Sequence, residues 1–287
     1  MINRFFIIGN PRSGTTLLRL MLNRHPMMVV PPEAGFLVWL HKEFGERFEV
    51  NQFINRLRTT KKIENWKLDF EELTEILMEK NPGSYSELMD AVYIYYYNCV
   101  LNRRNVKQVG DKNNYYLNHI NLLNELYPEA KYIHIIRDGR SVAVSYKNIM
   151  KKKIDNKHAP RLATDMREIA AEWRSNVLKV EKSFSEIKKD LCTTVRFEDL
   201  VNDPGDVLKN ICSFLGISFA REMLGYYQTQ AADGLEPPAY FNWKEKNTLP
   251  IIKEEANRYQ ELSNNEIYEF EKINGSLLER LGYKCIS

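Results

Sequence analysis

Hydrophobic residues in this chain follow two patterns that alternate along its length. Short, largely apolar runs of four to six residues are separated by longer stretches in which apolar positions recur at helical spacing. Runs of that length, bounded by glycine, proline or polar residues, are typical of buried strands. Because such strands alternate with helices, the pattern predicts an α/β fold with one parallel five-stranded sheet flanked by helices. The five runs span residues 5–8, 27–30, 106–109, 131–136 and 192–197.

The stretch at about residues 36–105 differs from the rest, because it has no strand-like alternation and is rich in aromatic residues. We predict that it forms a helical insertion. Aromatic residues at helical spacing usually fill a core. The alternative is that they line the walls of an acceptor-binding cap. Since the chain contains no internal repeat, low-complexity tract or linker, we expect one domain spanning residues 1–287.

Charge and composition narrow the possible partners. The chain has 41 Lys and Arg against 38 Asp and Glu, a formal net charge of +3, so no general basic field indicates nucleic-acid binding. The four cysteines are scattered without a C-x-x-C pair, which indicates neither a disulfide framework nor a zinc site. No apolar run approaches the roughly 20 residues of a membrane span. We therefore expect a cytoplasmic protein, apart from any anchor outside this sequence; the oligomeric state is not indicated.

The first apolar run leads into a glycine-bounded loop followed by a helix. Gly9 and Gly14 have the spacing of the phosphate-binding loop G-x-x-x-x-G-K-[ST], and Thr16 occupies its final position. Thr15, however, stands where that loop has its lysine, which reaches the β- and γ-phosphates of a nucleotide. The cation inside this loop is Arg12, whose forked guanidinium suits a terminal oxyanion. The loop therefore predicts a phosphate-type ligand that is bound without magnesium.

A second candidate anion site follows the strand at residues 131–136. Arg137 ends that strand, and Ser145 lies eight residues further on, about two turns into the next helix. Ligands of open α/β sheets bind at the carboxyl ends of the strands, so this pair could hold a second phosphate of the same ligand. The alternative for Arg137 is a salt bridge, which is common for an arginine at a strand end.

Two further charged residues stand at or beyond strand ends. Glu33 follows the strand at residues 27–30 after two prolines, and Lys112 follows the strand at residues 106–109. Both positions face the ligand edge of a parallel sheet. For Glu33 the alternative is a carboxylate that stabilises the start of the next helix.

With these motifs together, the chain resembles the sulfotransferases that use 3′-phosphoadenosine 5′-phosphosulfate (PAPS). Residues 11–16 (PRSGTT) look like the family's loop for the 5′-phosphosulfate, and Arg137 with Ser145 matches its 3′-phosphate motif. Residues 195–200 (VRFEDL) are similar to a segment whose aromatic residue, here Phe197, lies by the adenine. Trp243 and Lys244 occupy a late loop that closes over the cofactor in relatives.

The resemblance implies a P-loop-like fold, PAPS as donor, 3′-phosphoadenosine 5′-phosphate (PAP) as product, and no metal requirement. It also implies direct in-line transfer, with Glu33 as the general base and with Lys112 and Arg12 stabilising the transferred group. Asp111 is the rival base. Glu33 and the Gly110-Asp111-Lys112 segment, with no histidine close by, resemble the tyrosylprotein and bacterial branch more than the cytosolic small-molecule branch. The loop residues implied in cofactor binding are Arg12, Ser13, Gly14, Thr15 and Thr16.

Two other functions are considered. A P-loop kinase or ATPase with a degenerate loop is disfavoured by Thr15 in the lysine position. A non-catalytic nucleotide-binding module is disfavoured by the joint presence of Glu33 and Lys112. The acceptor is not determined, because sugars, phenols, peptides and lipid head groups would all need the same base.

Overall fold

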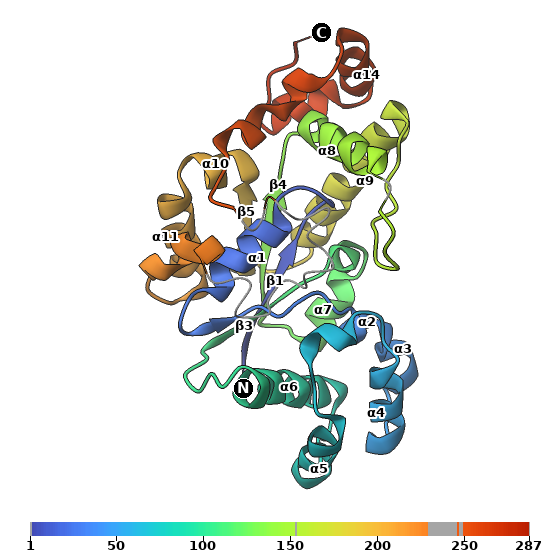
Figure 1. Cartoon of the computed structure of the whole chain (residues 1–287), viewed down its shortest axis with the longest axis vertical. Coiled ribbons are helices and arrows are strands. Elements are labelled where there is room, and N and C mark those ends of the chain that lie inside the picture. The colour runs from blue at the N-terminus through green and yellow to red at the C-terminus, as the bar shows by residue number, and fades with distance from the viewer. Residues whose placement is uncertain (1, 153, 229–245, 247–248, 287) are drawn as a thin grey trace.

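The sheet has five parallel strands, and it lies at the centre of the molecule (Figure 1). The computed structural model describes residues 2–152, 154–228, 246 and 249–286. The strand order is β2-β3-β1-β4-β5, and every neighbouring pair is parallel. The predicted α/β fold is thus confirmed. The strands are β1 (Asn3–Ile8), β2 (Met28–Val29), β3 (Gln108–Lys112), β4 (Lys131–Ile136) and β5 (Cys192–Arg196).

Both faces of the sheet are covered, which explains why its strands are apolar rather than alternating. Phe5 and Ile7 of β1 pack on one side with α1 (Thr15–Asn23), α11 (Pro204–Leu215) and η5 (Arg221–Gln228). Phe6 and Ile8 point to the opposite side, because successive side chains of a strand alternate. There they meet α7 (Ile120–Leu126), part of α9 (Met166–Ser185) and the insertion.

The segment between β2 and β3 is helical, as predicted. Its aromatic side chains pack on one another: the ring centroid of Trp66 lies 4.9 Å from that of Phe36, 5.0 Å from that of Tyr93 and 4.5 Å from that of Tyr96. These rings fill a core, so for them the core interpretation holds. The helices are α2 (Phe36–Trp39), α3 (His41–Phe44), α4 (Val50–Arg58), η1 (Ile63–Trp66), α5 (Phe70–Lys80), α6 (Tyr85–Tyr95) and η2 (Tyr96–Val100).

Several element boundaries differ from those expected; β1 begins two residues earlier, at Asn3, and β2 is shortened to Met28–Val29. Strand β3 runs on to Lys112, because Gly110–Lys112 pair in register with Phe5–Ile7 of β1. Strand β5 ends at Arg196, and Phe197 begins α10 (Phe197–Asn202). The helix after β3 is split into η3 (Asn114–Asn118) and α7.

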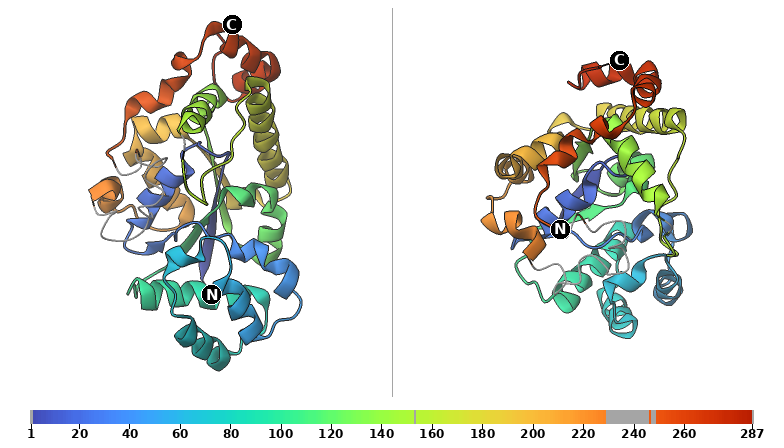
Figure 2. Two further views of the ribbon diagram at one scale, coloured as in Figure 1. Left: turned by 45° about the vertical axis from the view of Figure 1, so that its right-hand side comes forward. Right: turned by 45° about the horizontal axis from the view of Figure 1, so that its top comes forward.

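The C-terminal half adds helices at the end of the molecule opposite the insertion (Figure 2). Helix α8 (Gly139–Lys151) follows β4, and α14 (Asn264–Arg280) packs against α9 and α8. Between α11 and α14, η8 (Lys253–Glu261) lies against both α8 and α10. A short turn, η4 (Lys189–Leu191), precedes β5.

A buried ion network joins the start of α8 to α14. Arg140 pairs through Nη2 with Asp138 Oδ2 at 2.7 Å and through Nη1 with Glu271 Oε1 at 2.5 Å. All three side chains are at most 4% exposed. Asp138 also caps α8 by accepting a hydrogen bond from the Arg140 backbone N–H. The network therefore helps to fix the turn that follows Arg137.

Replacing Glu271 with alanine is expected to lower the free energy of unfolding by about 3–5 kcal/mol, because it leaves part of a buried guanidinium uncompensated. Urea denaturation followed by circular dichroism measures the change. The matched control is Glu181→Ala, which breaks the exposed pair with Arg280 (2.8 Å) and should cost at most about 1 kcal/mol. Equal losses in the two variants would contradict the importance given to the buried network.

Candidate active site

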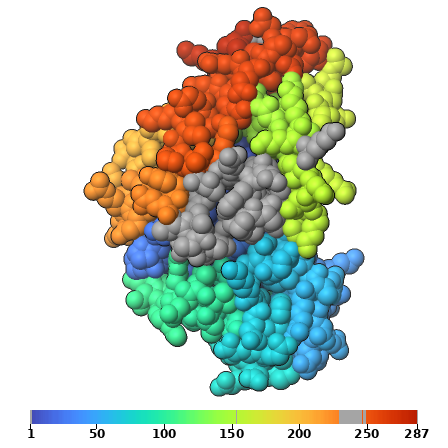
Figure 3. Space-filling view, viewed as in Figure 1, coloured from blue at the N-terminus to red at the C-terminus, as the bar shows by residue number. Residues whose placement is uncertain are grey.

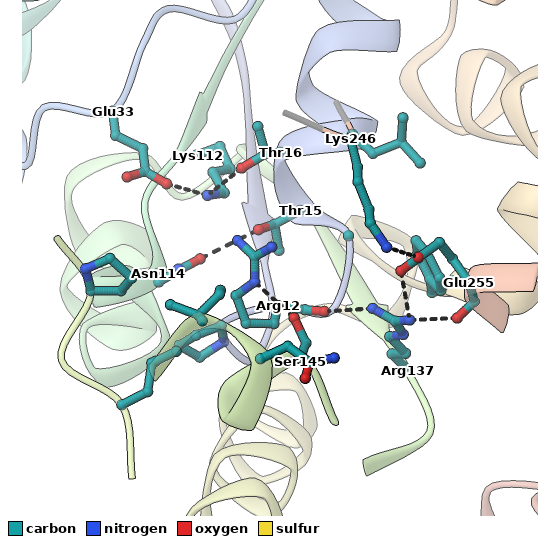
Figure 4. A pocket seen from close by; sticks show the side chains of 18 of the residues that line it. Arg12, Thr15, Thr16, Glu33, Lys112, Asn114, Arg137, Ser145, Lys246 and Glu255 are labelled. Atoms are coloured by element: carbon teal, nitrogen blue, oxygen red, sulfur yellow. Dashed lines mark hydrogen bonds and ion pairs between the residues drawn. The ribbon is translucent and has the colours of Figure 1, made fainter. Parts of the chain in front are cut away.

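A cavity of about 1100 Å³ opens at the carboxyl edge of the sheet, where ligands of open α/β folds bind. On the face drawn in Figure 3, the insertion and the C-terminal helices lie at opposite ends. Nine of the residues singled out in the sequence line this one cavity (Figure 4). They are Arg12, Gly14, Thr15, Thr16, Glu33, Lys112, Arg137, Ser145 and Phe197.

Ser13 is buried and does not line the cavity, and its hydroxyl has no hydrogen-bond partner among the described residues. Trp243 and Lys244 fall outside the described part of the chain.

The glycine loop has a backbone that leaves the start of α1 open to a ligand. Gly14 is the N-cap of α1, with a φ of 93° and no side-chain capping hydrogen bond. A Cβ at Gly14 would collide with the ring of Phe197, so only glycine fits between loop and ring. Arg12 also has a positive φ, 69°, a strained conformation that is typical of functional sites. The first N–H groups of α1 and its positive dipole end therefore face the cavity.

Side chains that the sequence did not single out hold this loop in place. Asn10 donates a hydrogen bond to the carbonyl of Pro11 at 2.8 Å and accepts one from Asn176 of α9 at 2.6 Å. Both asparagines are buried. No local signal predicts this pair, because 166 residues separate its members in the sequence.

Two arginines are packed together beside the loop. Arg12 Nε donates to Ser145 Oγ at 3.1 Å, and Arg137 Nη1 donates to the Arg12 carbonyl at 3.1 Å. Burial, with a smaller contribution from the charge of Arg137, lowers the pKa of the Arg12 guanidinium to about 10. Burial also lowers the pKa of Arg137. An anion bound between them would relieve this repulsion, so the pair favours a multiply charged ligand.

Arg137 forms the salt bridge that the sequence offered as the alternative to ligand binding. It forms an ion pair with Glu255 of η8 at 3.6 Å and donates to the Glu255 carbonyl. Its guanidinium also lies 4.3 Å from the ring centroid of Phe197. The buried Nε of Arg137 has no hydrogen-bond partner among the described residues, and Arg137 lines the cavity.

Glu33 lies between two lysines at the other side of the cavity. Its Oε1 forms an ion pair with Lys112, and its Oε2 accepts a hydrogen bond from Lys62 of the insertion at 2.7 Å. Lys112 Nζ also donates to Thr16 Oγ1 at 3.3 Å, so this lysine bridges the glutamate and the glycine loop. The side chain of Lys112 is 2% exposed and that of Glu33 is 12% exposed. Neighbouring ammonium groups favour the charged carboxylate.

Asp111, the rival base, does not face the cavity. Its carboxylate accepts hydrogen bonds from the hydroxyls of Tyr116 (2.6 Å) and Tyr93, both buried. Burial raises the pKa of Asp111. Because consecutive residues of a strand point to opposite faces, Asp111 and Lys112 are directed apart. Of the two carboxylates considered, only Glu33 lines the cavity.

Other cavity residues carried no signal in the sequence. Asn114 accepts a hydrogen bond from Thr15 at 3.4 Å, and His158 contacts Glu64 of the insertion at 3.0 Å. Their partners lie far away in the chain, so periodicity and motif spacing could not indicate them. Further cavity residues that the sequence did not single out are Lys61, Lys62, Lys157, Arg161, Lys246, Glu255 and Arg258.

Two features are absent from the described residues. No group of three or more His, Cys, Asp or Glu able to hold a metal ion occurs among them. Within the same part of the chain, no helix has the length and hydrophobicity needed to span a membrane.

Comparison with known proteins identifies the family. The sulfotransferase family model matches residues 4–221, about three quarters of the chain, and the chain therefore belongs to this family. Protein-tyrosine sulfotransferase A of Caenorhabditis elegans is 26% identical over 230 residues, which are 79% of this chain and 53% of the relative. The chain thus spans about half the length of that relative.

Solved structures share the fold. The sulfotransferase domain of the Synechococcus PCC 7002 olefin synthase has a TM-score of 0.63 at 23% identity, covering 96% of this chain and 94% of that domain. Mouse sulfotransferase SULT7A1 complexed with PAP has a TM-score of 0.50 at 15% identity, covering 96% of this chain and 85% of that protein. Family membership favours sulfuryl transfer over the kinase and ATPase alternatives.

Proposed function

We propose that this protein is a PAPS-dependent sulfotransferase that transfers a sulfuryl group to a hydroxyl or amine of its acceptor. The observation that carries the proposal is one cavity lined by Arg12, Arg137 and Glu33, in which a second carboxylate, Glu255, is paired with Arg137. Arg12 lies in the glycine loop, Arg137 lies at the end of β4, and Glu33 lies beside Lys112. A donor with phosphate groups at two positions matches two cationic centres, and membership of the sulfotransferase family supports it.

The cavity residues fit the parts of this donor. The N–H groups at the start of α1, with Arg12, Thr15 and Thr16, would hold the 5′-phosphosulfate. Arg137 and Ser145 would hold the 3′-phosphate, and the ring of Phe197 would contact the adenine. When bound, the donor supplies an activated sulfuryl group whose leaving group is a phosphate.

The chain's own residues would then promote transfer. Glu33 accepts the proton of the acceptor hydroxyl or amine while that nucleophile bonds to the sulfur. The bond between the sulfur and the bridging phosphate oxygen breaks, and Lys112 with Arg12 stabilises the negative charge that develops there. Protonated Glu33, the sulfated acceptor and PAP result, so atoms and charge balance. No metal is needed in this scheme.

Peptide tyrosine is the first acceptor to test, because the C. elegans relative is named a protein-tyrosine sulfotransferase. The helical insertion at about residues 36–105, within a single domain spanning residues 1–287, would form one side of the acceptor entrance. Lys61 and Lys62 of this insertion line the cavity and support that assignment.

Thermal unfolding with added ligands tests the proposal. PAP should raise the melting temperature in the absence of magnesium, and ATP with magnesium should have little effect. Stabilisation only by ATP with magnesium would overturn the proposal. A screen with ³⁵S-labelled PAPS across peptide, phenol, sugar and lipid acceptors then identifies the acceptor class.

Replacing Arg137 with alanine is expected to weaken PAP binding by roughly 10- to 100-fold, the effect of losing a charge-assisted hydrogen bond. Isothermal titration calorimetry measures the affinity. Arg196→Ala is the matched control, because Arg196 ends the neighbouring strand without lining the cavity. If Arg137→Ala bound PAP with unchanged affinity, Arg137 would have only the structural role of pairing with Glu255.

A further inference from the structure

We propose that Lys62 of the insertion is a positioning residue that keeps Glu33 oriented and ionised while Lys112 engages the donor. This inference rests on the proposed function of the cavity and deepens it. It concerns a contact between the sheet edge and a segment 29 residues further along the chain.

The two lysines bind different oxygens of the same carboxylate. Lys112 pairs with Oε1 of Glu33 and Lys62 with Oε2, the latter at 2.7 Å. The Lys62 side chain is only 18% exposed, so solvent screens this contact weakly. Glu33 is thus held from two directions.

The two contacts differ in what a donor would do to them. Lys112 also lies 3.3 Å from Thr16 of the glycine loop, where the phosphosulfate is proposed to bind. A bound phosphate group competes for that ammonium and draws it away from Glu33. Lys62 comes from the insertion side and remains available, so the base keeps one ion pair during transfer.

The surrounding structure fixes Lys62 in this place. Lys62 is the N-cap of η1 and adopts a φ of 72°, a conformation that is unfavourable for a residue with a side chain. The buried indole of Trp66, at the other end of η1, donates a hydrogen bond to the carbonyl of Pro32 at 2.9 Å. This bond fixes η1 beside the backbone of Glu33, and it therefore keeps Lys62 within contact of the Glu33 carboxylate.

Among the described residues, cations from at least three parts of the chain interact with Glu33. Lys112 lies on β3, Lys62 lies at the start of η1, and Arg12 of the glycine loop is close enough for its charge to interact with the glutamate. Removing one of these cations makes the carboxylate harder to ionise. Glu33 should then titrate at higher pH in a variant that lacks the Lys62 ammonium.

Carbon-13 NMR of protein labelled at the glutamate carboxyl carbons tests this without any acceptor. The Glu33 resonance is assigned by its loss in Glu33→Gln, and its titration midpoint is measured with and without PAP. In Lys62→Met the titration midpoint of Glu33 should lie at higher pH than in the wild type. This difference between variant and wild type should be larger when PAP is bound than when it is absent. Lys62→Arg should restore the wild-type midpoint.

Lys67→Met is the matched control. Lys67 is an exposed lysine at the other end of η1, also has a positive φ (51°), and does not line the cavity. Its variant should titrate like the wild type. An unmoved midpoint in folded Lys62→Met overturns the inference, whereas failure of the wild type to bind PAP overturns the proposed function instead.

With ³⁵S-labelled PAPS and a tyrosine peptide as the probe, Lys62→Met should lower kcat by about 10-fold, which is less than the roughly 10²–10⁴-fold contribution of a general base itself. The KM for PAPS should stay near the wild-type value, and Lys62→Arg should recover most of the rate. A raised KM for PAPS with unchanged kcat would overturn the assignment, because Lys62 would then bind the donor.

Discussion

The Glu33→Gln variant is expected to transfer the sulfuryl group at a rate about 10²–10⁴-fold lower than the wild type, because a general base usually contributes a factor of this size. Glutamine has nearly the same shape as glutamate but cannot accept the acceptor's proton. The amide oxygen of glutamine can replace only one of the two carboxylate oxygens that Lys62 and Lys112 contact, because the amide NH2 cannot accept a hydrogen bond from the other lysine. PAP binding should still be nearly unchanged, since Glu33 is assigned no contact with the donor. Single-turnover transfer of ³⁵S-sulfate and calorimetric titration with PAP measure the two quantities.

A matched control separates the base from a general effect of charge. Glu43→Gln removes a carboxylate of the helical insertion. Glu43 pairs with Arg56 at 2.8 Å and does not line the cavity. This variant should transfer sulfate at the wild-type rate. Near-normal turnover in Glu33→Gln would exclude Glu33 as the base, and Asp111, which is directed away from the cavity, could not replace it without a rearrangement of β3.

The Lys112→Met variant is expected to lower kcat by about 10²–10³-fold, the cost of removing one preorganised group that stabilises developing charge. Lys112 is almost completely buried, and it contacts both Thr16 and Glu33. Its ammonium is therefore poorly screened and lies between the proposed donor site and the base. Methionine keeps most of the volume of the side chain, so packing should be preserved.

Pre-steady-state transfer from PAPS measures this rate, and thermal unfolding verifies the fold. Lys147→Met, which breaks an ion pair with Glu266 away from the cavity, is the control and should keep the wild-type rate. If Lys112→Met weakened PAP binding as strongly as it lowered kcat, Lys112 would act in binding rather than on the developing charge.

The sequence predicted the sheet because strands buried on both faces are continuous apolar runs, a local and periodic signal. It also indicated Glu33, Lys112 and Arg137, since the carboxyl ends of parallel strands meet at one edge. The extension of β3 to Lys112 was not predicted. Gly110 and Asp111 look like a strand end by composition, and only their pairing with β1 makes them part of the strand.

The contacts that complete the cavity are long-range and follow no period. Asn176 reaches the glycine loop from α9, Glu255 reaches Arg137 from η8, and Lys62 reaches Glu33 from the insertion. Each depends on where a distant helix is packed. Neither the spacing nor the type of these residues distinguishes them from other surface or core residues.

By itself, the sequence determined the kind of sheet, the edge at which the candidate site lies, and the loop in which Thr15 stands at the position of the nucleotide-binding lysine while Arg12 supplies the cation. These properties follow from local patterns of hydrophobicity and spacing. Only the tertiary structure shows that Glu33 lines the cavity and Asp111 does not, because strand alternation turns Asp111 toward buried tyrosines and Lys112 toward the cavity. It also decided that Glu33 lies between two lysines, since one of them is brought there by the packing of the insertion.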